Sequence, residues 1–279
     1  MTMSLLRGVR IVSLGLNTPG PVAAARLASL GATVTKIEPP SGDALKTFAR
    51  TWYERLCRNQ TVITLDLKDA AQRSQLEELL SNTDLLLASF RPSALRRMGL
   101  DWEALHQRHP RCSFVGIIGY APPEEERSGH DLTYLAGTGL LNPPEIPMSL
   151  FVDLAGAERA VNLSLALLLN FARNGEAGCG FVSLRECAND LAAPLEAGLT
   201  VPGGLLGGGY PFYSMYKASD GWIAIAALEP HFAQRLLTEL GVEAADRGRL
   251  ESVFRTHTAA EWERWAAERD LPLAAVLQA

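Results

Sequence analysis

The hydrophobic and polar positions in the first half of the chain repeat one pattern, a short apolar run followed by a segment of helical spacing. The runs that resemble β-strands cover 9–15, 33–40, 61–67, 84–90 and 112–120. Helices are predicted over 19–31, 69–82 and 101–108, the first of which begins with proline and ends with glycine. Short apolar strands that alternate with helices favour a mostly parallel sheet with helices on both faces. The pattern therefore predicts an α/β fold of the Rossmann-like kind.

The second half of the chain predicts a smaller domain. A long apolar helix is expected over 156–173, after a region rich in turns. The glycine-rich stretch 200–212 indicates either a mobile loop or a linker, and 221–228 resembles one further strand before two final helices. We therefore predict a large α/β domain of residues 1–198 and a small α+β domain of residues 199–279.

Composition narrows the range of partners. Hydrophobic residues make up 47% of the 279 residues and charged residues 20%, which is enough to build packed cores. The net charge is -5 and no long cluster of Lys and Arg is present, so nucleic acid is not an expected partner. An anionic ligand would have to be bound by a few individually placed cations.

The four cysteines are scattered, which argues against a disulfide framework and against a zinc site, and suits a reducing compartment. The first fifteen residues lack the apolar core of a signal peptide. The longest apolar stretch, 163–172, is too short to span a bilayer. We expect a cytoplasmic protein without a bound metal.

Gly15 and Gly20 flank the first turn between strand and helix, but they do not have the G-x-G-x-x-G spacing of dinucleotide-binding proteins. The N-terminus of the following helix could receive an anion, and a plain connecting turn is an equally good interpretation.

Three residues are candidates for acid/base chemistry. His130 lies in the loop stretch "SGHDLTYLAGTGLL", Asp153 interrupts an apolar run, and Glu229 ends an apolar strand before a proline. Partial burial raises the pKa of such carboxyl groups toward neutrality. Each also has a structural interpretation, because His130 can simply close a loop, Asp153 can cap the next helix and Glu229 can begin one.

Longer stretches of the chain resemble a known family. "LRGVRIVSLGLNTPGPVAAARLASLGATVTKIEPPSGD", "CRNQTVITLDLKD" and "SFRPSALRRMGLDWEAL" are similar, in order and spacing, to the family III CoA-transferase superfamily. "SGHDLTYLAGTGLL", "FVDLAGA" and "GGGYPFYSMYKASDGWIAIAALEPHF" resemble its α-methylacyl-CoA racemase branch. The resemblance covers nearly the whole chain.

The resemblance implies an activity in lipid metabolism. Enzymes of this branch exchange the α-proton of a 2-methylacyl-CoA thioester through an enolate-like intermediate. His130 would act on one face of the α-carbon and Asp153 on the other, with Glu229 hydrogen-bonded to the imidazole. Backbone N–H groups of the helix after Asp153 could stabilise the oxyanion. No prosthetic group is implied, and coenzyme A is part of the thioester substrate.

The resemblance also implies a CoA groove along the large domain and an interlocked homodimer. Cations along such a groove suit a ligand with several phosphate charges, although Lys36 could equally be ordinary surface charge. The residues that match the CoA-binding positions are Pro19, Gly20, Pro21, Lys36, Arg58, Asn59 and Arg91.

The chain departs from the family pattern in three places. Family members usually continue beyond "LPLAAVLQA", which leaves open a truncated chain, a gene fragment or a shortened relative with altered dimer contacts. The loop 119–131 replaces the usual Gly-Gln-x-Gly-Pro sequence, so part of the acyl-CoA pocket differs. Cys179 stands where a glutamine is common, a position without a catalytic role.

Two alternatives to the racemase remain open from the sequence. In a CoA-transferase of the same superfamily, Asp153 would attack the thioester and form an acyl anhydride. A non-catalytic relative would bind acyl-CoA without exchanging the α-proton.

Overall fold

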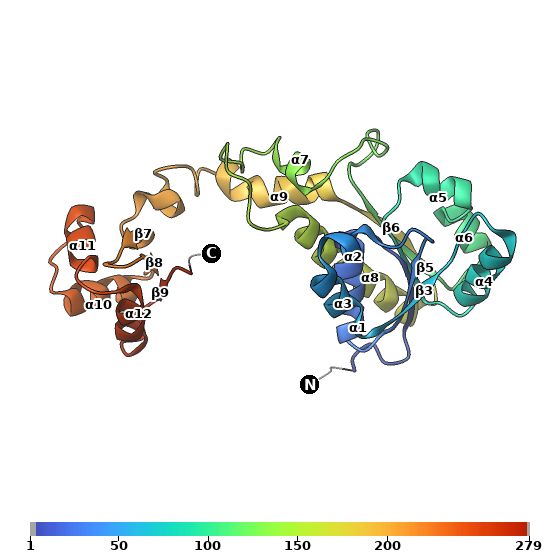
Figure 1. Cartoon of the computed structure of the whole chain (residues 1–279), viewed down its shortest axis with the longest axis horizontal. Coiled ribbons are helices and arrows are strands. Elements are labelled where there is room, and N and C mark those ends of the chain that lie inside the picture. Colours follow the sequence, from blue (N-terminus) through green and yellow to red (C-terminus); the bar gives the residue numbers. More distant parts are fainter. Residues whose placement is uncertain (1–3, 278–279) are drawn as a thin grey trace. The chain divides into compact units, whose positions relative to one another are not determined.

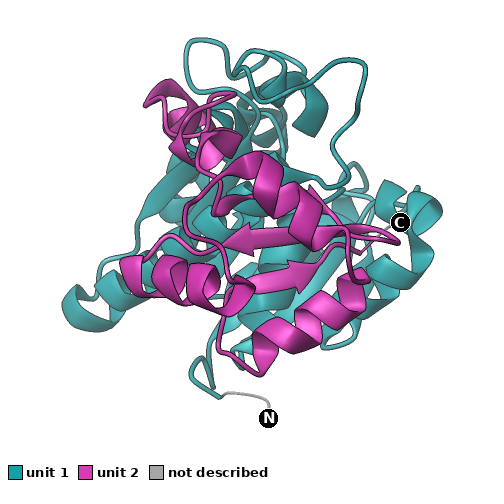
Figure 2. Ribbon diagram, turned by 90° about the vertical axis from the view of Figure 1, so that its left-hand side faces the viewer, with its two compact units in different colours: residues 1–191 teal, residues 192–279 magenta. Residues whose placement is uncertain are grey.

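The computed structural model describes residues 4–277 of the chain, which folds into two compact units, residues 1–191 and 192–279 (Figure 2). The division falls seven residues before the boundary predicted at 198/199, inside helix α9 (Leu184–Glu196).

Unit 1 contains a six-stranded sheet in which all strands are parallel and the order is β3-β2-β1-β4-β5-β6. Its strands are β1 (Arg10–Leu14), β2 (Thr33–Glu38), β3 (Gln60–Thr64), β4 (Leu85–Ala88), β5 (Ser113–Ile118) and β6 (Cys179–Ser183). The α/β architecture is thus confirmed. The sequence pattern did not reveal β6, an edge strand that is only partly buried.

Helices cover both faces of this sheet (Figure 1). They are α1 (Pro19–Ser29), α2 (Ala44–Phe48), α3 (Arg50–Cys57), α4 (Ala70–Leu80), α5 (Pro92–Met98), α6 (Trp102–Arg108), α7 (Asp131–Leu135), α8 (Phe151–Asn174) and α9. Helix α8 begins five residues before its predicted start at residue 156. Asp153 therefore lies inside the first turn of α8, and the interpretation of Asp153 as the residue that caps this helix is wrong, since the N-cap is Leu150.

Successive strand residues point to opposite faces, which produces two separate cores. Ile11 and Leu85 belong to a core that includes residues of α1 and α8. Val12 and Leu86, their neighbours in sequence, belong to a core that includes residues of α4 and α6. All four residues of β4 are buried, because β4 lies in the middle of the sheet between β1 and β5. The near-continuous apolar runs of the sequence follow from this burial on both faces.

Unit 2 is a small α+β unit, as predicted. Its antiparallel sheet has the order β7-β8-β9 and its helices supply Phe254 and Trp262 to a core shared with Tyr216. The elements are the short π-helical turn η1 (Leu205–Gly209), β7 (Tyr213–Lys217), β8 (Trp222–Ala226), α10 (Pro230–Leu240), α11 (Arg247–Phe254), α12 (Ala259–Ala267) and β9 (Leu273–Ala275).

Among residues 4–277, no helix has the length and apolar character needed to cross a membrane.

Candidate active site

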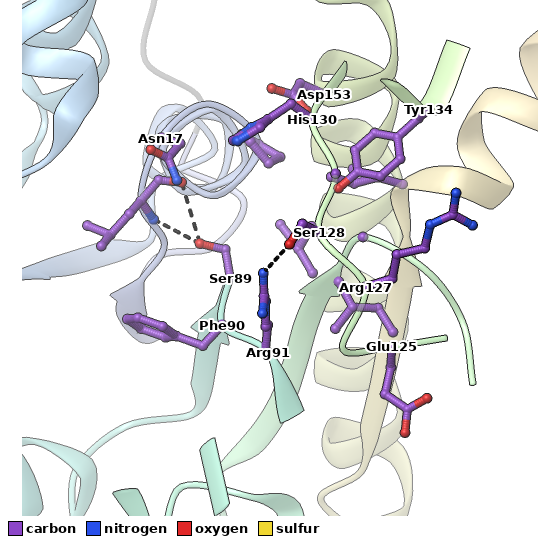
Figure 3. A pocket seen from close by; sticks show the side chains of 17 residues that line it. Asn17, Ser89, Phe90, Arg91, Glu125, Arg127, Ser128, His130, Tyr134 and Asp153 are labelled. Atoms are coloured by element: carbon purple, nitrogen blue, oxygen red, sulfur yellow. Dashed lines mark hydrogen bonds between the residues drawn. The ribbon is translucent and has the colours of Figure 1, made fainter. Parts of the chain in front are cut away.

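A cavity of about 350 Å³ opens at the carboxyl ends of β1, β4 and β5 (Figure 3). It lies where the strand order reverses, because the chain runs outward from β1 to β2 on one side and to β4 on the other. Ligands of open α/β sheets bind at this switch point. Four of the residues proposed from the sequence line the cavity: Pro19, Arg91, His130 and Asp153. The fold thus brings both predicted bases of unit 1 to one site.

The turn between β1 and α1 forms one wall of the cavity. Gly15 and Gly20 touch through their backbones, since a Cβ on Gly20 would lie 2.5 Å from the Cα of Gly15. Between them, Asn17 adopts a left-handed φ of 66° and lines the cavity. The Leu16 N–H donates to Ser89 Oγ at 2.9 Å, which ties this turn to the end of β4. The two glycines therefore permit a close turn, and this turn places Asn17 at the wall of the cavity.

His130 lines the cavity from the start of α7. It is the N-cap residue, and its backbone is fixed because its N–H donates to Thr133 Oγ1 at 2.8 Å and its carbonyl accepts from the Thr133 N–H at 2.8 Å. Gly129 packs against the ring of Tyr134, where a Cβ would lie 2.3 Å from Cε1. The loop interpretation of His130 thus holds for its backbone, while its exposed side chain is free to face the cavity.

Asp153 lines the same cavity from the first turn of α8. Burial raises the pKa of its carboxyl group from 3.8 to about 6, the nearby Asp131 carboxylate adds to the rise, and a hydrogen bond from Thr18 opposes it. A carboxyl group with this pKa exchanges protons readily near neutrality, as a general acid or base must. In Figure 3, Asp153 and His130 appear together at the top of the cavity.

The N–H groups at the start of α8 are already bound. Asp131 Oδ1 accepts from the Val152 N–H at 2.7 Å and from the Asp153 N–H at 2.9 Å. The expectation that this helix terminus stabilises an oxyanion is therefore wrong for these two donors. Tyr134 is a different donor at the cavity, since burial raises the pKa of its hydroxyl to about 12 and keeps it protonated.

The residues expected along a CoA groove lie in several places. Gly20 and Pro21 are buried in the first turn of α1, while Arg58 and Asn59 are exposed between α3 and β3. Arg91 lines the cavity, and its Nη2 donates to Ser128 Oγ at 2.8 Å.

Lys36 does not fit the expectation of a phosphate-binding cation. Its side chain is fully buried, and its ammonium group donates to Glu38 and, at 2.8 Å, to Asp43 Oδ2. Tyr53 completes this cluster by donating to Glu38 Oε1 at 2.8 Å. Two buried carboxylates thus balance the charge of Lys36, and we correct its assignment to a structural one.

A second cavity, of about 470 Å³, lies at the carboxyl ends of β2 and β3 and shares Phe90 with the first. Lys68, Arg73 and Arg97 line it. Glu38 and Asp66 line it as well, so the cations outnumber the carboxylates and can bind an anion that Lys36 cannot reach. Sequence reasoning missed these residues because they are spread over two helices and a loop, and only the fold brings them together.

Glu229 belongs to unit 2. It is the N-cap residue of α10, it is exposed, and its side chain makes no capping hydrogen bond. The interpretation that Glu229 begins the next helix is confirmed, since α10 starts at Pro230 directly after it. The pairing of Glu229 with His130 stays a prediction.

The raised pKa of Asp153 implies a cost in stability. A group whose pKa is higher in the folded state destabilises that state as the pH rises from its ordinary pKa of 3.8 to about 6, and the full cost applies above this range. Asp153→Asn should therefore stabilise the protein at pH 7.5, by roughly 1–3 kcal/mol. Thermal unfolding of both proteins between pH 4 and 8 measures this difference. It should shrink toward acid pH, and a difference independent of pH would contradict the assignment.

Comparison with known proteins identifies the family to which this fold and site belong. The model of CoA-transferase family III matches residues 6–279. The chain belongs to CoA-transferase family III. Members of this family are enzymes that act on CoA thioesters without a prosthetic group, and they include transferases and racemases.

The relatives of this chain include both a racemase and CoA-transferases. α-Methylacyl-CoA racemase from Mus musculus is 30% identical over 92% of this chain and 74% of its own length. Cinnamoyl-CoA:phenyllactate CoA-transferase from Clostridium sporogenes is 27% identical over 97% of this chain and 78% of its own. A crystal structure of Rv3272 from Mycobacterium tuberculosis superposes with a TM-score of 0.83 at 26% identity, covering 98% of this chain and 84% of that one.

Proposed function

We propose that the protein is an acyl-CoA racemase or epimerase that inverts the α-carbon of a 2-methylacyl-CoA thioester. The observation that carries the proposal is that an imidazole, His130, and a carboxyl group with a pKa of about 6, Asp153, line one cavity. Inversion of a stereocentre needs an acid on one face of the carbon and a base on the other. A histidine on one face and a carboxyl group with a raised pKa on the other meet this need.

The reaction transfers protons without other bond changes. One base removes the α-proton, and the electron pair of the C–H bond moves into the thioester carbonyl to give an enolate. The second residue, which starts in its protonated form on the opposite face, then donates its proton to the α-carbon as the enolate returns to the thioester. The Tyr134 hydroxyl, which stays protonated, is a suitable donor to the enolate oxygen.

The two adjoining cavities support an extended CoA path across the end of the sheet. In this proposal the thioester occupies the cavity of His130 and Asp153, and the phosphate groups lie toward Lys68, Arg73 and Arg97. The hydrogen bond of Glu229 to the imidazole, the homodimer and the cytoplasmic location stay predictions.

Exchange in deuterium oxide tests the proposal. A single enantiomer of a 2-methylacyl-CoA, incubated with the protein in D₂O, should gain one deuterium at the α-carbon and lose optical purity. Mass spectrometry and chiral analysis of the released acid measure the two changes. The control is Glu158→Gln, a change on α8 at a carboxylate that pairs with Arg26 at the surface and should leave the rate unchanged. Bound substrate without exchange would refute the proposal.

A CoA-transferase is the second candidate, favoured by the carboxylate of Asp153 in the cavity and by the transferases among the relatives. Asp153 would attack the thioester carbonyl and expel the CoA thiolate, which leaves an acyl anhydride on the enzyme. Incubation with acyl-CoA and a carboxylic acid acceptor would then form a new thioester, with hydroxylamine trapping the anhydride at Asp153. Transfer without α-deuteration would favour this candidate over the racemase.

A further inference from the structure

We propose that Asp131 is a positioning residue, whose carboxylate fixes Asp153 relative to His130 by binding the first turn of α8. The inference rests on the proposed function, in which these two side chains are the bases. Asp131 itself does not line the cavity and does not contact the substrate in this proposal.

Asp131 caps a helix that has no cap of its own. The N-cap residue of α8 is Leu150, whose apolar side chain accepts no hydrogen bond, so the first N–H groups of the helix need another acceptor. Asp131 Oδ1 supplies it from 21 residues earlier in the chain, at 2.7 Å from the Val152 nitrogen and 2.9 Å from the Asp153 nitrogen. The side chain of Asp131 is buried and its residue is only 5% exposed, so water cannot easily replace it.

One carboxylate thereby links the two bases. Asp131 follows His130 directly in sequence, and its side chain binds the backbone of Asp153 itself. The backbone of His130 is fixed in turn by its bonds with Thr133 in α7. The distance between the bases therefore depends on a short covalent and hydrogen-bonded path and not on the long loop between α7 and α8. A two-base reaction needs this rigidity, because a misplacement of about 1 Å can cost 10²-fold in rate.

The charge of Asp131 has a second effect on Asp153. Burial is the main cause of the raised pKa of Asp153, and the Asp131 carboxylate raises it further. The other titratable or polar groups that face this carboxyl group are the Thr18 hydroxyl at the start of α1, the His130 imidazole and the Tyr134 hydroxyl in α7. Among the groups that influence the pKa of Asp153, Asp131 is the one carboxyl group, and burial raises the pKa of Asp131 as well.

Two substitutions separate the cap from the charge. Asp131→Asn keeps an oxygen that accepts the two N–H groups and removes the charge, so the pKa of Asp153 should fall from about 6 toward 3.8 while the maximal rate stays within about tenfold of the wild type. Asp131→Ala removes both the acceptor oxygen and the charge. The kcat for exchange should then fall about 10²-fold, with KM changed by less than about threefold. The asparagine variant therefore rescues most of the rate that the alanine variant loses.

Asp101→Asn is the matched control, because Asp101 Oδ1 caps α6 through the Ala104 N–H away from the cavity. It should change neither the pH profile nor kcat. The pKa of Asp153 is also read directly, by ¹³C NMR titration of its carboxyl carbon. This measurement does not need turnover, so it tests Asp131 even if wild-type protein exchanges no α-proton and the proposed function fails. An unchanged kcat in a folded Asp131→Ala protein would overturn the positioning role, and an unchanged Asp153 pKa in Asp131→Asn would contradict the effect of the Asp131 charge.

Discussion

Asp153→Asn should abolish inversion of the α-carbon while α-proton exchange continues with one of the two enantiomers. The amide cannot accept or donate a proton at the α-carbon, so the rate of racemisation should fall at least 10²–10⁴-fold, the range that a positioned acid or base contributes. His130 still removes the proton that points toward it. The imidazolium that results exchanges with D₂O and returns a deuteron to the same face, which gives exchange with retention of configuration.

Separate incubation of each enantiomer in D₂O measures this outcome. One enantiomer should gain deuterium and stay optically pure, and the other should gain none. Asp153→Asn is expected to be more stable than the wild type above pH 6, and its thermal unfolding separates loss of activity from loss of structure. Racemisation at the wild-type rate, or exchange with both enantiomers, would remove Asp153 from the chemistry.

The sequence predicts the sheet well where strands are buried on both faces. Four of the five predicted runs became β1, β2, β4 and β5, which supply buried residues to the two cores, and the fifth became the edge strand β3, in which no residue is buried. The edge strand β6 was missed, because Cys179–Ser183 is buried only at its end and carries no clear apolar pattern. Burial was the signal for the four buried strands, while the β-branched residues of Gln60–Thr64 were the signal for β3.

The start of α8 was missed for a different reason. Capping rules look for a polar residue next to the helix, and Leu150 does not satisfy them. The actual acceptor, Asp131, is distant in sequence, so only the folded chain reveals it. Because α8 begins at Phe151 and not at the predicted residue 156, Asp153 lies in the first turn of the helix and not in the loop before it.

Long-range pairing also explains why Lys36 was misjudged. A lysine in a β-branched run looks like a cation available to a ligand, and its neighbours in sequence do not show that Asp43 and Tyr53 close around it. The resemblance to a family supplied His130 and Asp153, and the carboxyl ends of parallel strands explain why residues so far apart in the chain meet. Neither the family resemblance nor a position at the end of a predicted strand pointed to Lys68, Arg73 and Arg97, the cations of the second cavity.

His130→Asn should give the mirror image of the Asp153 result and should separate a racemase from a transferase. Without the imidazole, Asp153 is the remaining base, so exchange should persist only with the enantiomer that Asp153→Asn cannot exchange. Racemisation should again fall at least 10²–10⁴-fold. A transferase needs only the carboxylate as nucleophile, so His130→Asn would leave acyl transfer nearly intact while Asp153→Asn abolishes it.

The opposite enantiomer preference of the two variants is the decisive result, because loss of structure or of substrate binding would impair both enantiomers alike. His109→Asn is the control for histidine removal, since the His109 ring binds Glu77 at 2.8 Å away from the cavity and should not affect exchange. If both variants lose exchange with the same enantiomer, His130 and Asp153 act on one face of the α-carbon. A single acid/base pair on one face cannot invert the centre, and the racemase proposal would then be replaced by the transferase.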